Sequence, residues 1–252
     1  MTRFGHGAAT STGRVRQFNE DSYLARPPLY AIADGMGGHA AGDLASALAI
    51  ETLTECAREG PLSVPAVLAA LEAADQAIAR HEPAGMGTTV TGLASLETAG
   101  DHHLMVFNVG DSRVYRFAGG HLDQVTVDHS EVQELVRAGK LTRDQARTHP
   151  RRNVITRALG SGRPLRADHW LLPAIAGDRY LLCSDGLSGE LPDDLILPLL
   201  AGAGPQQAAT ALVDAANDAG GRDNITVIVV DVADDDLGDI PRTLPPPVNS
   251  PR

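Results

Sequence analysis

The sequence predicts an α+β fold in which helices are layered on antiparallel sheets. Strand-like runs outnumber helix-like ones, and the helix-like segments come in consecutive pairs instead of following every strand. Short turns at Gly110-Asp111 and Gly119-Gly120 separate strand-like runs, so we expect these runs to pair as antiparallel neighbours. A doubly wound parallel sheet would instead place a helix between successive strands.

The first part of the chain predicts one strand and two helices. A short apolar run over residues 28–33 predicts a buried strand that ends at Asp34. An Ala/Leu-rich stretch from 39 to about 59 predicts a helix with one apolar stripe. Ser63 is a favourable N-cap for the next helix. The side chains expected on the buried face of that helix are Val67, Leu68, Leu71, Ala74 and Ile78.

The middle of the chain changes to strand periodicity and then to a polar helix. The expected strands cover residues 88–93, 104–109 and 112–117. From Asp128 to about Arg147 the chain becomes polar and helical, with an apolar stripe made by Val132, Leu135 and Val136. We expect this stretch to be a small, mobile excursion from the sheet.

The last part of the chain predicts a return to strands. Strands are expected at 169–172, 179–183 and 225–230, with a helix from 205 to about 219 before the last of them. From residue 234 onward, consecutive aspartates and prolines cannot bury apolar surface. We therefore expect one folded domain over 1–233 and a disordered tail over 234–252.

Composition and charge argue against several classes of protein. A chain of 252 residues, of which 43% are hydrophobic, can bury a core without disulfides. Cys56 and Cys183 match no metal-ligand spacing, and we expect reduced thiols in a cytoplasmic protein. Separately, we expect the protein to be a monomer. No apolar run approaches the ~18 residues that cross a bilayer, and the first residues form no signal core. A net charge of −11 argues against nucleic-acid or anionic-membrane partners.

Acidic residues recur beside Gly or Asn where predicted strands end. Asp34 and Asp185 both follow an apolar strand and precede glycine. Each Asp-Gly pair taken alone is typical of an ordinary turn. If several of these carboxylates converge, however, their repulsion requires a counter-charge, and an all-oxygen set of ligands favours Mg²⁺ or Mn²⁺.

The glycine-rich segment after the first predicted strand has a second interpretation. Residues 35–40 fit the dinucleotide-binding pattern G-x-G-x-x-A between a strand and a helix. That function also needs a second parallel strand ending in an acidic residue ~20 positions later. Residues 40–59 instead predict one helix, and another helix follows, so we do not favour a dinucleotide site.

Seven motifs in order resemble one known family. They are Arg-x-x-Asn-Glu-Asp at 16–21, Ala-Asp-Gly-Met-Gly-Gly-His at 33–39, Gly-Thr-Thr at 87–89, Asn-Val-Gly-Asp-Ser-Arg at 108–113, Val-Thr-Val-Asp-His at 125–129, Ser-Asp-Gly-Leu at 184–187 and Gly-Arg-Asp-Asn-Ile-Thr-Val at 221–227. Over residues 6–232 the chain resembles the metal-dependent serine/threonine protein phosphatases of the PPM type (protein phosphatase 2C), in their compact bacterial form. This resemblance implies an αββα sandwich of two antiparallel sheets flanked by helix pairs.

The resemblance also implies a binuclear Mg²⁺ or Mn²⁺ centre, with a possible third ion. By similarity, Asp34 bridges both core ions and the Gly35 carbonyl binds one of them. The remaining ligands implied are Asp185 and Asp223 on the other core ion, Glu20 and Asp21 in the same shell directly or through water, and Asp111 with Asp185 at the third ion.

Two further residues match catalytic positions of the family. Arg16 matches the phosphate-binding arginine, whose forked donors suit two phosphate oxygens, although it could also pair with Glu20 at the surface. His39 matches the proposed general acid that protonates the leaving alkoxide. The polar stretch over about 128–156 corresponds to the family's flap beside the site, which is thought to influence substrate choice. Nearby, Lys140 and the run Arg147, Arg151 and Arg152 could dock phosphopeptides, but we expect a solvated face.

The function implied is hydrolysis of phosphoserine and phosphothreonine monoesters in proteins by a hydroxide that bridges two metal ions. The implied partners are phosphorylated proteins, including a bacterial serine/threonine kinase and its substrates. A catalytically inactive phosphoprotein-binding module of the same fold is the alternative, and a phosphatase for small phosphate esters is a third possibility. Measured turnover separates the first two, and a comparison of phosphopeptides with metabolites separates the third.

Overall fold

The fold is a sandwich of two antiparallel sheets, seen in a computed structural model that describes residues 3–37, 40–81, 85–98 and 101–233. The first sheet has five strands in the order β1-β11-β10-β7-β8. Their bounds are β1 Arg3–Ser11, β11 Ile225–Ala233, β10 Arg179–Cys183, β7 Arg113–Ala118 and β8 His121–Gln124.

The second sheet follows the order β2-β3-β5-β6-β9, with β4 paired to β3 off this path. Its strands are β2 Asp21–Arg26, β3 Leu29–Met36, β5 Val90–Thr98, β6 Asp101–Val109, β9 Asp168–Pro173 and the short β4 Gly87–Thr88. Every strand pairing in both sheets is antiparallel.

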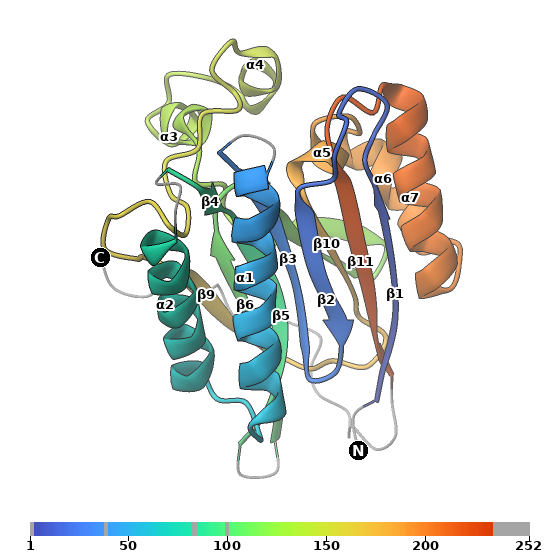
Figure 1. The fold of residues 1–252 in the computed structure, drawn as a ribbon. Helices are drawn as coiled ribbons and strands as arrows, with labels where there is room; N and C mark the ends of the chain where they lie inside the picture. Colours follow the sequence, from blue (N-terminus) through green and yellow to red (C-terminus); the bar gives the residue numbers. More distant parts are fainter. Residues whose placement is uncertain (1–2, 38–39, 82–84, 99–100, 234–252) are drawn as a thin grey trace.

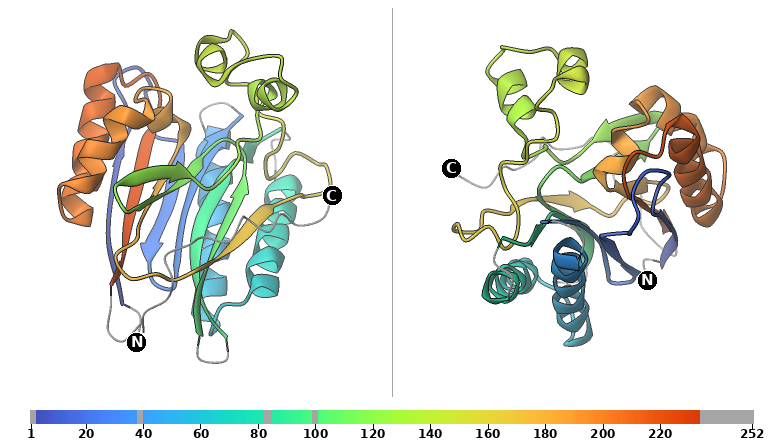
Figure 2. Two further views of the ribbon diagram at one scale, coloured as in Figure 1. Left: turned by 180° about the vertical axis from the view of Figure 1, so that it is seen from behind. Right: turned by 45° about the horizontal axis from the view of Figure 1, so that its top comes forward.

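Helices cover the outer face of each sheet (Figures 1 and 2). The second sheet is covered by α1 Ala40–Arg58 and α2 Val64–Arg80, and the first by α5 Asp185–Ser188, α6 Asp193–Ala201 and α7 Pro205–Ala219. The helices α3 Glu131–Arg137 and α4 Arg143–Thr148 stand beyond one end of the sandwich, at the end where α1 begins. The predicted αββα architecture is therefore confirmed.

Strand β11 shows why the two sheets stack between helices. Its apolar run has no polar alternation because both faces of the strand are covered. Ile225, Val227 and Val229 pack against α5–α7, whereas Ile228 and Val230 pack into the layer between the sheets. Each such buried side chain contributes about 1.5–3 kcal/mol to folding. Because side chains alternate between the two faces of a strand, this pattern also fixes the face on which a polar side chain near the end of the strand lies.

The predicted helix over 128–147 is wrong in one respect, because the segment forms two short helices. Gly139 between α3 and α4 has a φ of 68°, a left-handed conformation that a continuous helix excludes. Thr142 then starts α4 with a capping box closed by Gln145. No helix in the described residues is both long and apolar enough to cross a membrane.

The expectation that the runs 104–109 and 112–117 pair with each other is also wrong. β6 belongs to the second sheet and β7 to the first, so the chain crosses between sheets at Gly110 and Asp111. Gly110 has a φ of 115°, and an added Cβ there would lie 2.5 Å from the Cβ of Thr89. The turn at Gly119-Gly120 does join antiparallel neighbours, β7 and β8, as predicted.

Strands β1, β2 and β8 and helix α6 were not predicted from the sequence. β1 pairs with β11 over its whole length, from Arg3 opposite Ala233 to Ser11 opposite Ile225. Gly7 allows this strand to touch helix α7, because an added Cβ would lie 2.3 Å from the Cα of Gln206. The predicted tail over 234–252 lies outside the described residues.

Candidate metal centre

Two carboxylates lie on neighbouring strands at one end of the layer between the two sheets. Tyr30 and Ile32 of β3 point into this layer, so Asp34, two residues further on, points the same way. In the antiparallel register, Asp21 of β2 lies directly opposite Asp34. Like charges opposite each other on neighbouring strands are destabilising, so this pair needs an external compensation.

Three further carboxylates reach the same place from other elements. Asp185 is the first residue of α5 and follows β10, Asp223 lies two residues before β11, and Asp111 lies in the crossing between the sheets. The charges of Asp21, Asp185, Asp111 and Asp223 all raise the pKa of Asp34, after its burial. The structure thus brings together five carboxylates that were predicted from separate motifs.

Burial and mutual repulsion oppose ionisation of these acids. Burial is the main cause for each, and it raises the pKa of Asp21 to about 7 and that of Asp185 to about 6. Burial, then the charge of Asp185, raises the pKa of Asp111 well above its usual range. Cations bound among these groups would restore the charged forms.

The unpaired oxygen atoms fit hard divalent cations. Oδ1 of Asp21 and Oδ1 of Asp111 are buried and accept no hydrogen bond. Carboxylate oxygens without imidazole or thiolate neighbours suit Mg²⁺ or Mn²⁺ better than Zn²⁺ or Cu²⁺. In the positions that the described side chains occupy here, however, no three His, Cys, Asp or Glu are arranged to hold one ion. The fit therefore rests on charge, burial and oxygen chemistry.

Two glycines let Glu20 reach the same region. An added Cβ at Gly35 would lie 2.1 Å from the Gly42 carbonyl oxygen and 2.7 Å from the Glu20 carbonyl oxygen. An added Cβ at Gly42 would lie 2.5 Å from Oε2 of Glu20. The backbone N–H of Gly35 also donates to the Glu20 carbonyl at 3.2 Å. Only glycines allow β3, the start of α1 and the Glu20 side chain to approach so closely.

Two hydroxyl groups that the sequence interpretation missed hold Asp21 in place. Ser184 Oγ donates to Asp21 Oδ2 at 2.9 Å, and Thr226 Oγ1 donates to the same oxygen at 2.7 Å. Ser184 occupies the N-cap of α5 but makes no side-chain capping bond there. These contacts fix one oxygen of Asp21 and leave Oδ1 available. Both residues lie inside the recognised motifs: Ser184 directly precedes Asp185, and Thr226 lies two residues after Asn224.

Asn224 connects the loop before β2 to the start of β11, and it too was missed. Its Oδ1 accepts from the Glu20 backbone N–H at 2.8 Å. Its Nδ2 donates to the Thr12 carbonyl at 2.9 Å and to the Phe18 carbonyl at 2.8 Å. One amide therefore holds the loop that carries Arg16 and Glu20 against the segment that carries Asp223.

Arg16 lies at the outer side of the centre. Its Nη2 is 2.7 Å from Oδ2 of Asp223, and about half of its side chain is exposed, at 52%. This hydrogen bond raises the pKa of the Arg16 guanidinium, and the ion pair is with Asp223 and not with Glu20. Arg16 is thus anchored to one predicted metal ligand. The other predicted catalytic residue, His39, lies outside the described residues.

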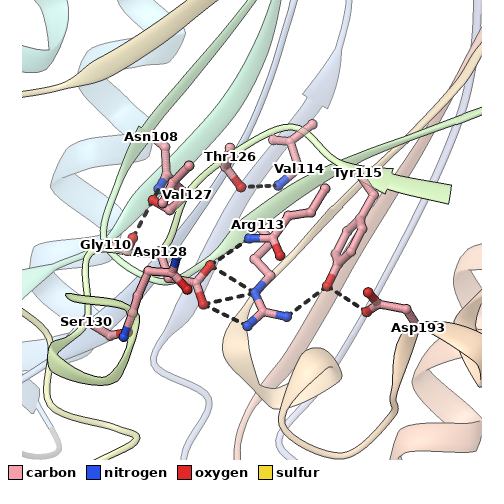
Figure 3. A network of polar contacts seen from close by, with 12 residues as sticks. Asn108, Gly110, Arg113, Val114, Tyr115, Thr126, Val127, Asp128, Ser130 and Asp193 are labelled. Carbon is pink, nitrogen blue, oxygen red and sulfur yellow. Dashed lines mark hydrogen bonds and ion pairs between the residues drawn. The ribbon is translucent and has the colours of Figure 1, made fainter. Parts of the chain in front are cut away.

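A largely buried arginine, Arg113, connects the centre to the segment over 128–156, which we call the flap (Figure 3). Arg113 donates from Nη2 to Oδ2 of Asp128 at 2.7 Å and from Nε to Oδ1 at 3.0 Å. Its Nη1 donates to the Tyr115 hydroxyl at 2.9 Å, which donates to Asp193 Oδ1 at 3.2 Å. The positive charge of Arg113 also opposes the rise in the pKa of Asp111.

The two ends of the flap are tied to the crossing between the sheets. The backbone N–H of Gly110 donates to Nδ1 of His129 at 3.1 Å, and the His129 N–H donates to the Gly110 carbonyl at 2.9 Å. The Thr156 N–H then donates to the His129 carbonyl at 2.7 Å. A bridge also joins Ser130 and Ile155. The flap therefore leaves and re-enters the sandwich beside Asp111.

The αββα sandwich of this chain is the fold of solved serine/threonine phosphatases, among them one described as a PPM phosphatase. A family model described as "Protein phosphatase 2C" matches residues 10–215. The chain belongs to the protein phosphatase 2C family.

Named relatives and solved structures agree with this family. Serine/threonine protein phosphatase PstP of Mycobacterium tuberculosis is 42% identical in an alignment 240 residues long that covers 92% of this chain and 46% of that protein. The chain thus spans about half the length of that relative. A crystal structure of the M. tuberculosis phosphatase PstP/Ppp has a TM-score of 0.85 and 41% identity, covering 92% of this chain and 99% of that one.

One similar structure was solved with metal. The catalytic domain of PstP in complex with two manganese ions has a TM-score of 0.85 and 40% identity to this chain. The comparison covers 93% of this chain and all of the other. The two manganese ions were observed in PstP and not in this chain.

Proposed function

We propose that this chain is a metal-dependent protein serine/threonine phosphatase that hydrolyses phosphoserine and phosphothreonine monoesters. The observation that carries the proposal is the convergence of Asp21, Asp34, Asp111, Asp185 and Asp223 on one buried end of the sandwich in a member of this family. Such a centre binds cations before it can accept a phosphate dianion, because bare carboxylates would repel the substrate.

We assign the core ligands to two Mg²⁺ or Mn²⁺ ions. Asp34, the Gly35 carbonyl, Asp185 and Asp223 would hold these ions, and Glu20 and Asp21 would complete the set directly or through water. Asp111 with Asp185 would form a weaker third site. When bound, the ions supply positive charge for the phosphoryl oxygens and lower the pKa of water towards neutrality.

The protein side chains then bind and orient the substrate. Arg16 presents its exposed guanidinium at the rim, where it can donate to phosphate oxygens while Asp223 fixes its position. Burial raises the pKa of the Cys183 thiol to about 12, so Cys183 does not act as a nucleophile at neutral pH. We propose water, made more acidic by the bound ions, as the nucleophile, and His39 as the proton donor to the leaving alkoxide.

The test is metal-dependent turnover by the purified protein. EDTA should abolish hydrolysis of p-nitrophenyl phosphate and of a phosphothreonine peptide, and Mn²⁺ or Mg²⁺ should restore both. Asp185→Asn should lower kcat/KM by more than about 10²-fold. Asp214→Asn, an exposed change on α7, is the matched control and should leave kcat/KM unchanged. Full activity of the Asp185 variant would refute the assignment.

The same assays separate the alternatives. A phosphoprotein-binding module would bind the peptide without turnover, and a small-ester phosphatase would prefer metabolites to peptides. We propose that the enzyme reverses phosphorylation by a bacterial serine/threonine kinase, and that it acts on that kinase and on its substrates. We also place it in the cytoplasm, because Cys56 and Cys183 are both free thiols and a reducing compartment keeps thiols in this state.

A further inference from the structure

An open cavity of about 450 Å³ lies between the flap and the sandwich. Asp111 and Asp185 line it on the side of the carboxylate centre, and residues of α3 and α4 line it on the side of the flap. This volume lies in the range of ligand sites in proteins. The cavity is therefore continuous with the carboxylate centre, where we propose that the phosphate binds.

Three arginines form the positive part of its wall. Arg143 and Arg147 lie four residues apart on α4, so they share one face of the helix, and Arg152 lies in the non-helical turn that follows α4. All three are exposed, and none forms an ion pair with another residue in the described parts of the chain. Their neighbour Arg151 does not line the cavity, since it pairs with Glu131.

The acidic side chains of the cavity are partly engaged elsewhere. Asp128 is neutralised by Arg113, and Asp193 accepts from the Tyr115 hydroxyl. Asp194 lies on the sandwich side with Asp111, Asp185 and Asp193, whereas on the flap side the three arginines outnumber Asp144, so the excess of positive charge is confined to the flap side. Val132 and Val136 of α3 add an apolar strip. The cavity is thus charged at the arginines and apolar beside them, as suits a peptide segment with an acidic side chain.

We propose that this cavity binds the substrate segment next to the phosphorylated residue, and that Arg143, Arg147 and Arg152 select an anionic side chain in it. This inference rests on the proposed function. The protein carries a net charge of −11, so most of its surface repels an acidic substrate. Residues 128–156 carry six basic and four acidic side chains and reverse this balance beside the site. Guanidinium groups pair with carboxylate or phosphate through two parallel hydrogen bonds.

The test compares the triple variant Arg143→Gln/Arg147→Gln/Arg152→Gln with Arg137→Gln. Arg137 is exposed at the end of α3 and does not line the cavity, so it is the matched control. The substrates are three phosphothreonine peptides of equal length, flanked by glutamates, by lysines or by a second phosphothreonine, and p-nitrophenyl phosphate. The glutamate and second-phosphate peptides distinguish the two sources of negative charge.

For the triple variant we expect kcat/KM to fall about 10-fold on the anionic peptides, mainly through KM. Turnover of p-nitrophenyl phosphate and of the lysine-flanked peptide should stay within about twofold, and added salt should reduce the difference. Unchanged kinetics on the anionic peptides, or an equal loss on all four substrates, would overturn the inference. The Arg137 variant should match the unmodified protein.

A binding measurement separates failure of this inference from failure of the proposed function. Fluorescence anisotropy with Mn²⁺ would report the affinity for glutamate-flanked and lysine-flanked peptides that carry a non-hydrolysable phosphonate. If no substrate is turned over but the triple variant still loses its preference for the glutamate-flanked peptide, the enzyme assignment fails and the docking assignment stands. If turnover is normal and neither protein prefers that peptide, only the docking assignment fails.

Discussion

Without metal, the unmodified protein should be less stable than the variant Asp185→Asn, because the buried aspartates destabilise the fold. Asp185→Asn removes one negative charge from a site where burial and the charge of Asp223 oppose ionisation. The amide keeps the shape of the side chain. We therefore expect a variant that is inactive and yet more stable in EDTA, as happens where function requires groups that destabilise the fold.

The size and pH dependence of this effect follow from the raised pKa. The pKa of Asp185 is about 6 in the folded protein, against an ordinary value of 3.8. A raised acid pKa contributes stability that is complete below the unfolded value and is lost as the pH rises through the folded value. Ionisation at pH 7 therefore costs roughly 3 kcal/mol, from about 1.4 kcal/mol per pK unit. Because the buried amide retains some desolvation cost, we expect a net gain of about 1–3 kcal/mol, or roughly 2–10 °C.

The assay is urea unfolding in EDTA at pH 5 and pH 7. The variant should be more stable than the unmodified protein at pH 7, and this advantage should shrink at pH 5. Adding Mn²⁺ should stabilise the unmodified protein more than the variant, because a ligand that binds only the folded state shifts unfolding. Asp214→Asn serves again as the exposed control. A variant that is less stable than the unmodified protein in EDTA at pH 7 would refute the reasoning.

Three other changes test how the centre is built. Asn224→Ala should destabilise the fold by about 2–3 kcal/mol and raise the Mn²⁺ concentration for half-maximal activity at least 10-fold, because Glu20 and its loop lose their anchor. Arg113→Lys should cost more than about 2 kcal/mol in urea unfolding, because lysine cannot keep the paired bonds to Asp128. Gly35→Ala should cost more than about 2 kcal/mol, because its Cβ would meet backbone at 2.1 Å.

An Asn224 variant with an unchanged Mn²⁺ requirement would show that the loop holds Glu20 by other means. If the Arg113→Lys protein were as stable as the unmodified protein, the hydrogen bonds from Arg113 to Asp128 would not contribute to stability. For Gly35 the control is Gly202→Ala, where the added Cβ would make only an ordinary contact at 3.6 Å. Equal effects at the two glycines would contradict the close approach described here.

The acidic positions were predictable because each one ends a strand in a recognisable local pattern. Asp34 and Asp185 both follow apolar runs and precede glycine, so the sequence shows where their carboxylates leave the core. The groups that orient them were not predictable in this way. Ser184 and Thr226 are common polar residues, and only the stacking of β10 and β11 against β2 brings their hydroxyls to Asp21.

Tertiary contacts also explain the errors in the fold prediction. The segment around Gly110 reads locally as a hairpin turn, but a turn signal does not say which sheet receives the next strand. Strand β1 contains few large apolar side chains, and its conformation is imposed by nine paired residues of β11 and by the contact of Gly7 with α7. In contrast, Ser63 does cap α2, because capping depends on neighbouring residues alone.

The bridge between Ser130 and Ile155 brings the chain back almost to the point where it departed. Everything from Glu131 to Val154 is therefore an insertion with a closed base, and its length and composition are uncoupled from the register of the sheets. Evolution or a protein engineer can exchange this insertion while the carboxylates stay where they are. Under the proposal that this insertion selects the substrate, specificity can change without altering the metal ligands.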